Sequence, residues 1–359
     1  MTIREVTHLR MMQQRVVGSD ISNPKLMLEW MGALQAQDFS MSKWALGCRL
    51  PGLKETDIEE SFNKGECLRT HAIRPTWHLL SPDNIKWLLK YSAPHIRNSL
   101  KSRYQKLGLT DKIFHKASSI IVNELVEKKI CLRRELIDLL EAQGIDTSMN
   151  KASYILMDIE LKGLICSGPL SNKKQTYTLL ASLECQEFLY SDDNSDAEIA
   201  KKYFTSRGPA TVKDFAWWSG LPQRKAKAVV EKITPELDSY IVNGQEYWIA
   251  KTKVETSYVD QQAFLLPAFD EMVVAYKDRS AIIDAEYLPR AVSRNGIIWP
   301  IVLLNGQAAG TWKRTIRKQE VMIEVSSFWG LSYSERNQIE EAAHQFASFI
   351  DKTPRVYFL

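Results

Sequence analysis

The segment from 110 to 181 constrains the fold of this chain more than any other stretch. Its first part, "TDKIFHKASSIIVNELVEKK", opens with a Thr-Asp pair typical of a helix N-terminus and continues with apolar residues at helical spacing. Two more helix-like parts, "LRRELIDLLEAQG" and "NKASYILMDIELKG", each reach a glycine where a helix can end. The final part, "LICSGPLSNKKQTYTLL", indicates two short strands around a polar turn. We therefore expect three helices followed by a β-hairpin.

The same order recurs from 195 to 252. "DAEIAKKYFTSRG", "ATVKDFAWWSG" and "LPQRKAKAVVEKI" predict three helices, and "LDSYIVNGQEYWIA" predicts a hairpin that turns at Asn243-Gly244. Residues 1–81 carry a looser copy, with four helix-like segments before a predicted hairpin in "CLRTHAIRPTWHLL". Because three helices before a hairpin is the order of a winged helix-turn-helix, we expect three such units in tandem.

Two further parts complete the expected organisation. Residues 82–109 predict a helical connector after the first unit. Beyond the third unit, "AFLLPAFDEMVVAY", "GIIWPIVLLNGQAAGTWKRTI" and "QEVMIEVSSF" favour strands, and "SYSERNQIEEAAHQFASFID" favours a terminal amphipathic helix. We expect an α+β fold in which the winged helix-turn-helix units, 1–81, 110–181 and 195–252, precede a small β-rich C-terminal module with a terminal helix over 253–359.

The composition is that of a folded protein of several modules. The 359 residues are 45% hydrophobic and 25% charged, and no run of about 18 apolar residues predicts a membrane span. The first 20 residues lack the basic start and apolar block of a secretory signal. The five cysteines are odd in number and form no C-x-x-C pair, which disfavours a zinc site and a disulfide framework. We expect a cytoplasmic protein.

Basic residues are clustered although the net charge is only +4. Three clusters on a balanced chain suit binding to a polyanion, while the alternative is a set of solvated helix faces. The clusters are Lys128-Lys129 with Arg133-Arg134, Arg224-Lys225 with Lys227, and Lys313-Arg314 with Arg317-Lys318.

Common cofactor and nucleophile motifs are missing from the sequence. It contains no P-loop, G-x-G-x-x-G, H-E-x-x-H or G-x-S-x-G, and its six histidines are scattered. We therefore expect a protein that uses neither a metal nor a nucleotide cofactor.

The first candidate site is "GALQAQDF", with Gln35, Gln37 and Asp38. An amide cannot accept a proton at neutral pH, but it can hold a water or a sugar oxygen in place. Asp38 could act as a general base or stabilise a developing cation. The alternative is a solvated helix end.

The second candidate site is the predicted hairpin "LRTHAIRPTWHLLS". Strand alternation places Thr76 and His78 on one face and Trp77 on the other. Arg69 and Arg74 could contact phosphates. A structural, hydrogen-bonded His78 is the alternative.

The third candidate site is "LLPAFDEMVVAYKDR", where Asp270 and Glu271 precede Tyr276, Lys277 and Arg279. Paired acids suit acid–base chemistry. An acidic turn beside basic residues more often forms a salt-bridged structural element, which the residues favour here.

Five motifs together resemble one protein family. "GALQAQDF", "LRTHAIRPTWHLLSPD", "YFTSRGPATVKDFAWWSGL", "LLPAFDEMVVAYKDR" and "GTWKRTIRKQEVMIEV" follow one another in the order and spacing of the winged-helix DNA glycosylases typified by AlkZ and YcaQ. The resemblance covers about residues 5 to 355 and is carried by the five motifs jointly, since each alone is weak.

The resemblance implies a monofunctional DNA glycosylase that removes cationic alkylated guanine from duplex DNA, including interstrand cross-links. We expect a monomer, which suits a protein that scans DNA for lesions. The family's catalytic motif is Q-x-Q or Q-x-D, and Gln35-Ala36-Gln37 matches the first form. Gln35 and Gln37 would position the attacking water, with Asp38, Thr76 and His78 as supporting residues. The residues expected to contact DNA are Arg69, Arg74, Arg133, Arg134, Arg224, Lys225, Lys227, Lys313 and Arg314.

Two other functions are compatible with the same fold, because a fold does not fix a function. A transcription regulator would bind DNA without catalysis and would prefer a sequence over damage. A scaffold for other proteins would lack the steep salt dependence of DNA affinity that both DNA-binding functions predict.

Overall fold

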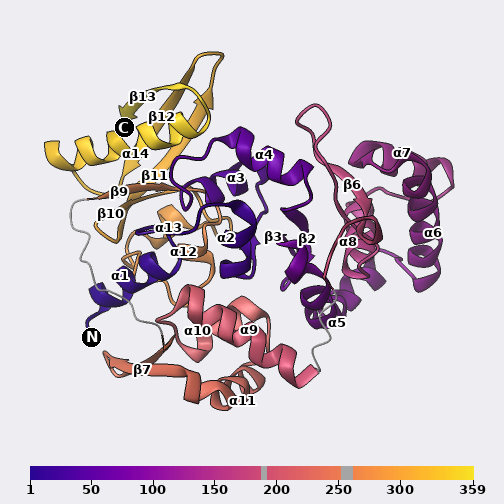
Figure 1. Cartoon of the computed structure of the whole chain (residues 1–359), viewed down its shortest axis with the longest axis horizontal. Coiled ribbons are helices and arrows are strands. Elements are labelled where there is room, and N and C mark those ends of the chain that lie inside the picture. The colour runs from indigo at the N-terminus through magenta and orange to yellow at the C-terminus, as the bar shows by residue number, and fades with distance from the viewer. Residues whose placement is uncertain (187–191, 252–261) are drawn as a thin grey trace. The chain divides into compact units, whose positions relative to one another are not determined.

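The computed structural model describes residues 1–186, 192–251 and 262–359. The chain divides into two compact units (Figure 1). One comprises 1–58 together with 196–359, and the other comprises 59–195. The predicted boundary between 252 and 253 lies outside the described residues. The assignment of segments to winged helix-turn-helix units, and their boundaries, stay predictions.

The unit of residues 59–195 contains the three helices and the hairpin expected over 110–181. Thr110 caps the first helix by accepting a hydrogen bond from the Ile113 backbone N–H, and Gly144 and Gly163 follow the next two with positive φ. The apolar faces of these helices share one buried core with the hairpin. The helices and strands of this unit are β2 (Leu68–Ala72), β3 (Thr76–Leu80), α5 (Pro82–Lys106), α6 (Asp111–Lys128), β4 (Cys131–Leu132), α7 (Arg133–Ala142), α8 (Lys151–Leu161), β5 (Ile165–Ser167), β6 (Thr176–Leu179) and the short 3-10 helix Leu180–Ser182.

The other unit begins with helices, as predicted, and with one short strand that was not predicted. These elements are α1 (Ile3–Gln13), α2 (Pro24–Met31), β1 (Leu34–Gln35), α3 (Phe39–Gly47) and α4 (Glu55–Asn63), the last of which crosses the division between the units. The predicted hairpin between 237 and 250 turns at Asn243 and Gly244, whose φ values are 50° and 75°. This part holds α9 (Asp192–Arg207), α10 (Val212–Ser219), α11 (Gln223–Ile233), the 3-10 helix Thr234–Glu236, β7 (Leu237–Val242) and β8 (Gln245–Ala250).

A five-stranded sheet in the order β13-β12-β11-β10-β9 forms the C-terminal part of this unit. The strands are β9 (Ala263–Leu266), β10 (Ile301–Leu304), β11 (Gln307–Ile316), β12 (Glu320–Ser327) and β13 (Thr353–Phe358). Helix α14 (Tyr333–Phe349) lies against the sheet (Figure 1), where the ring of Phe346 is 5.0 Å from Trp312 and 5.2 Å from Trp44. The predicted helix is present, but it is not terminal, because the chain returns along β12 as a parallel strand.

One predicted strand was wrong. Within "AFLLPAFDEMVVAY", only Ala263–Leu266 is a strand, and Glu271–Val274 forms the short helix α12. The Asp270 side chain caps this helix by accepting from the Met272 backbone N–H at 2.9 Å. A second short helix, α13 (Leu288–Ala291), follows before β10. Among the described residues, no helix is long and apolar enough to cross a membrane.

Candidate functional site

The Gln-Ala-Gln motif lies on and just after the two-residue strand β1. Gly32 ends α2 with a φ of 71°, a backbone conformation that glycine adopts without strain, and so turns the chain toward β1. The Gln35 side chain is 7% exposed. Gln37 and Asp38 are exposed, so the Gln37 side chain is open to solvent.

The backbone of Gln35 is held by a buried ion pair. The Gln35 N–H donates to Glu271 Oε1 at 2.9 Å, and the second carboxylate oxygen of Glu271 accepts from Arg207 Nε at 2.8 Å. Arg207 also donates to the carbonyl oxygens of Met31 at 2.7 Å and Ala33 at 2.5 Å. Arg207 and Glu271 are both almost fully buried. The segment leading into Gln35 is therefore fixed at three backbone atoms by two charged side chains.

The neighbouring acid makes a second buried pair. Asp270 accepts two hydrogen bonds from Arg49, at 2.8 and 2.9 Å, and both side chains are almost fully buried. Burial alone would lower the pKa of Arg49, but the Asp270 carboxylate raises it above its ordinary value. Arg49 follows the C-terminal end of α3, so the consecutive acids fix both β1 and α3. This geometry favours the structural interpretation of Asp270 and Glu271.

Further buried side chains surround Arg207. Trp218 Nε1 donates to Glu271 Oε2 at 3.2 Å, and the Trp218 ring lies 4.5 Å from the Arg207 guanidinium. Tyr276 donates to the Arg207 carbonyl oxygen at 2.7 Å, and Gln14 donates to the Tyr276 hydroxyl at 2.9 Å. Sequence reasoning missed Arg207 and Arg49. Their signal was an arginine inside an otherwise apolar or small-residue stretch, which suggests a buried partner.

Asp38 acts as the N-cap of α3. Its Oδ1 accepts from the Met41 backbone N–H at 3.0 Å, which satisfies one of the unpaired donors of the first turn. Arg314, predicted to contact DNA, lies close by and donates to Ser40 Oγ at 3.1 Å. Burial lowers the pKa of Arg314 below its ordinary value, and the nearby Asp38 carboxylate acts in the opposite direction. The structure thus brings one predicted basic residue to the motif.

The hairpin β2–β3, in the other unit, buries its histidines. His78 is 0% exposed, and its Nδ1 lies 3.0 Å from the Thr76 carbonyl oxygen, which favours the structural alternative for His78. His71 Nδ1 lies 2.7 Å from Glu160 Oε2. Burial acts to raise the pKa of Glu160, but His71 opposes it, and the net pKa is below its ordinary value. This pair joins the hairpin to α8.

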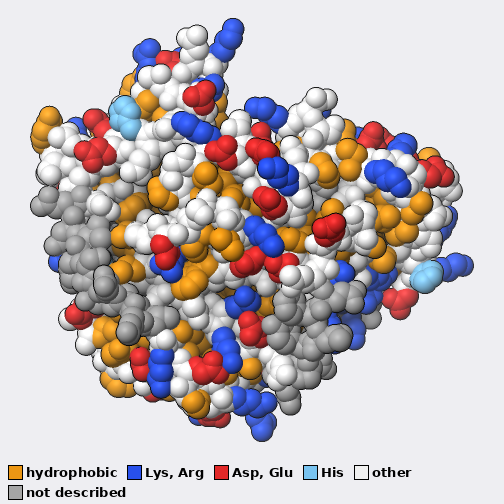
Figure 2. All heavy atoms as spheres, in the orientation of Figure 1, with side chains coloured by type: hydrophobic (Ala, Val, Ile, Leu, Met, Phe, Trp, Pro, Cys, Tyr) orange, Lys and Arg blue, Asp and Glu red, His pale blue; other side chains and the backbone are white. Residues whose placement is uncertain are grey.

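The predicted DNA-contacting residues differ in how accessible they are. Arg69 is buried, lies 4.3 Å above the Trp77 ring and donates to Gln175 at 2.9 Å, which favours a packing role. Arg133 donates to Ser153 Oγ at 2.9 Å. Residues Arg134, Arg224, Lys225, Lys227 and Lys313 are exposed, and Arg74 and Arg314 are half-buried. On the face shown in Figure 2, basic side chains are interspersed with acidic ones.

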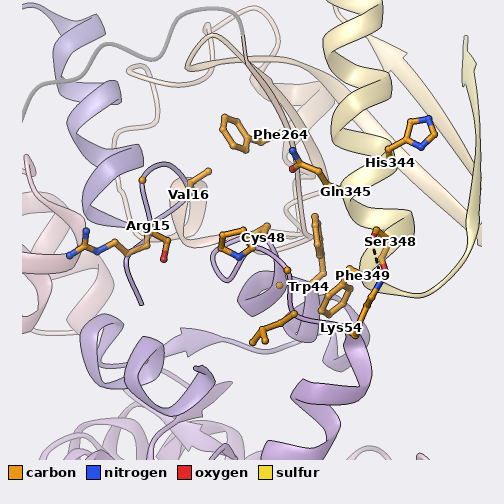
Figure 3. Close-up of a pocket in the computed structure, with 16 residues that line it drawn as sticks. Arg15, Val16, Trp44, Cys48, Lys54, Phe264, His344, Gln345, Ser348 and Phe349 are labelled. Atoms are coloured by element: carbon orange, nitrogen blue, oxygen red, sulfur yellow. Dashed lines mark hydrogen bonds between the residues drawn. The ribbon is translucent and has the colours of Figure 1, made fainter. Parts of the chain in front are cut away.

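A cavity lies at each end of α3. The cavity at the C-terminal end measures about 510 Å³ and is lined by Trp44, Cys48 and Phe349 among others (Figure 3). Burial raises the pKa of the Cys48 thiol to about 12, which leaves it a poor nucleophile. The cavity at the N-terminal end measures about 630 Å³ and is lined by Asp38 and Met41. Within the described ranges, no group of three or more His, Cys, Asp or Glu residues could hold a metal ion.

Three comparisons relate the chain to known proteins. A model of the protein family described as "DNA glycosylase AlkZ-like" matches residues 28–349. The "Interstrand DNA cross-link repair glycosylase" of Streptomyces sahachiroi is 24% identical over 305 residues, which are 81% of this chain and 81% of that protein. The solved structure of the Streptomyces sahachiroi DNA glycosylase AlkZ matches with a TM-score of 0.81 at 22% identity and covers 100% of both chains. This structural likeness confirms the expected α+β fold.

Proposed function

The chain belongs to the AlkZ-like DNA glycosylase family, and from this membership we propose that it hydrolyses the N-glycosidic bond of cationic alkylated guanine in duplex DNA. One relative is named an interstrand cross-link repair glycosylase, which supports including cross-linked guanine among the substrates. The observation that carries the proposal is the Gln-Ala-Gln motif, with Gln35 held by Glu271 and Gln37 exposed.

The chemistry suits two amides. Alkylation at ring nitrogen seven makes guanine positively charged, so the base departs with the electron pair of the glycosidic bond and needs no acid to protonate it. The sugar becomes an oxocarbenium-like cation, which the DNA phosphates stabilise. Water then bonds to the anomeric carbon and loses a proton to solvent. Gln35 and Gln37 orient that water through hydrogen bonds rather than by accepting its proton.

The remaining parts of the proposal concern DNA binding. The segments predicted to be winged helix-turn-helix units would bind the DNA duplex, and the exposed basic residues would contact its phosphates. The protein would act as a monomer on the nucleoid in the cytoplasm, scanning for damage rather than for a sequence.

The test is excision from a duplex with one guanine methylated at ring nitrogen seven, followed by alkali to cut abasic sites. We expect Gln35→Ala and Gln37→Ala to lower the single-turnover rate at least tenfold while DNA affinity is kept. Gln105→Ala, an exposed glutamine on α5 in the other unit, is the matched control. Binding without excision of a methylated or a cross-linked guanine would favour the transcription regulator instead.

A further inference from the structure

We propose that the cavity at the N-terminal end of α3 binds an apolar, aromatic substituent carried by the alkylated base. This proposal rests on the proposed function. The cavity measures about 630 Å³, within the range of small-molecule pockets. Asp38 lines it and follows Gln37 directly, which places the two Cα atoms about 3.8 Å apart. A group attached to a base at the motif can therefore reach the cavity.

Most of the residues that line this cavity are apolar, and some of these are open to solvent. Trp299 is 43% exposed and Ile297 is 39% exposed, and both line the cavity, so its wall presents an exposed apolar patch. Phe269 also lines the cavity, with a φ of 58° that a phenylalanine rarely adopts. Its backbone N–H donates to the Ile298 carbonyl oxygen at 3.3 Å, which holds the segment of Trp299 beside it. This contact fixes two parts of the cavity wall relative to each other.

The charged residues that line the cavity determine which part of the substrate can enter it. Arg290, Lys313 and Arg314 line the cavity, and Asp38, its acidic residue, is engaged in capping α3. Three cations disfavour entry of the positively charged guanine ring itself. They favour a DNA phosphate at the rim, which leaves the apolar walls for an uncharged substituent. An aromatic substituent gains most there, because it can stack on Trp299.

The experiment compares two duplexes, one with guanine methylated at ring nitrogen seven and one with guanine benzylated there. The readout is the ratio of the single-turnover rate constants for benzyl and methyl substrates. We expect Trp299→Ala to lower this ratio about tenfold, equivalent to about 1.4 kcal/mol. Trp299→Phe should retain most of it, and Ile297→Ala should lower it about threefold. Tyr333→Ala removes a ring that is 81% exposed at the start of α14 and should keep the wild-type ratio.

The possible results separate failure of the pocket from failure of the proposed function. A ratio unchanged in both Trp299→Ala and Ile297→Ala would overturn the proposal. If the ratio is unchanged because both substrates slow equally, the residues act in folding or in general DNA binding. If thermal melting shows that Trp299→Ala does not fold, Ile297→Ala decides, because a threefold lower ratio supports the pocket and an unchanged ratio overturns it. If the wild-type enzyme excises methylated guanine and the variants keep the wild-type ratio, the proposed function is retained and only the pocket is rejected. Wild-type enzyme that excises neither base removes both.

Discussion

At the scale of residues, the backbone leading into the Gln-Ala-Gln motif is held by a buried ion pair. Glu271 bridges the Gln35 backbone and Arg207, and all three are buried. Buried ion pairs add little net stability, but removing one partner leaves an uncompensated charge in a low-dielectric environment. We infer that Glu271 and Arg207 are positioning residues, which act on the reaction through Gln35.

Glu271→Gln should therefore lower kcat about tenfold and change KM less, because DNA binding is kept while Gln35 shifts. The same change should lower the free energy of unfolding by about 3 kcal/mol. Asp138→Asn, which removes one partner of the exposed pair between Arg134 and Asp138, is the control and should cost less than about 1 kcal/mol. A destabilised Glu271→Gln that keeps its full kcat would contradict the positioning role.

Asp38 tests whether the motif's acid is a cap or a catalyst. Asp38→Ala should lower the free energy of unfolding by about 1 kcal/mol, because α3 loses its N-cap. Asparagine caps helices as well as aspartate does, so Asp38→Asn should keep both stability and excision. Denaturant unfolding and single-turnover excision are the two measurements. Loss of excision in a fully stable Asp38→Asn would make the carboxylate catalytic.

At the scale of elements, local signals predicted what local interactions build. Thr110 at the start of α6 and the glycines after α7 and α8 marked helix ends that the structure confirms. Long-range packing decided the rest. The run after Asp270 has the apolar composition of a strand, yet it forms α12, whose N-cap Asp270 and first residue Glu271 are held by arginines distant in sequence. Gln35 and Gln37 were predicted to be catalytic through a family resemblance, whereas the only local signal of Arg49 and Arg207, which hold Asp270 and Glu271, was an arginine within an apolar or small-residue stretch.

The hairpin β2–β3 should make stability depend on pH through Glu160. The Glu160 pKa is lowered from 4.5 in the folded state, so its contribution is present above pH 4.5 and is lost as pH falls below that value. The stability difference between wild type and Glu160→Gln should therefore be largest near pH 7 and shrink below pH 4.5. Urea unfolding at pH 7 and pH 3.5 measures it. A difference that stays constant across this range would contradict the role of the His71–Glu160 pair.

At the scale of the whole molecule, the proposed activity requires that the protein bind duplex DNA through exposed cations. Two of the predicted contacts should behave differently, because Arg224 is exposed and Arg69 is buried over Trp77.

Arg224→Ala should weaken binding to all duplexes alike and reduce the slope of log affinity against log salt by about 1. Arg69→Ala should lower the free energy of unfolding and leave that slope unchanged. Fluorescence anisotropy over a range of salt concentrations measures both. Equal slopes for wild type and Arg224→Ala would remove Arg224 from the DNA interface.

The most direct test of the central claim is the release of free base from a duplex that carries one methylated guanine, measured at saturating enzyme for wild type, Gln35→Ala and Gln37→Ala. We expect wild type to release methylated guanine and to leave unmodified guanine in place, and we expect either substitution to slow release at least tenfold with DNA affinity unchanged. Release at the wild-type rate by both variants would contradict the catalytic role of Gln35 and Gln37.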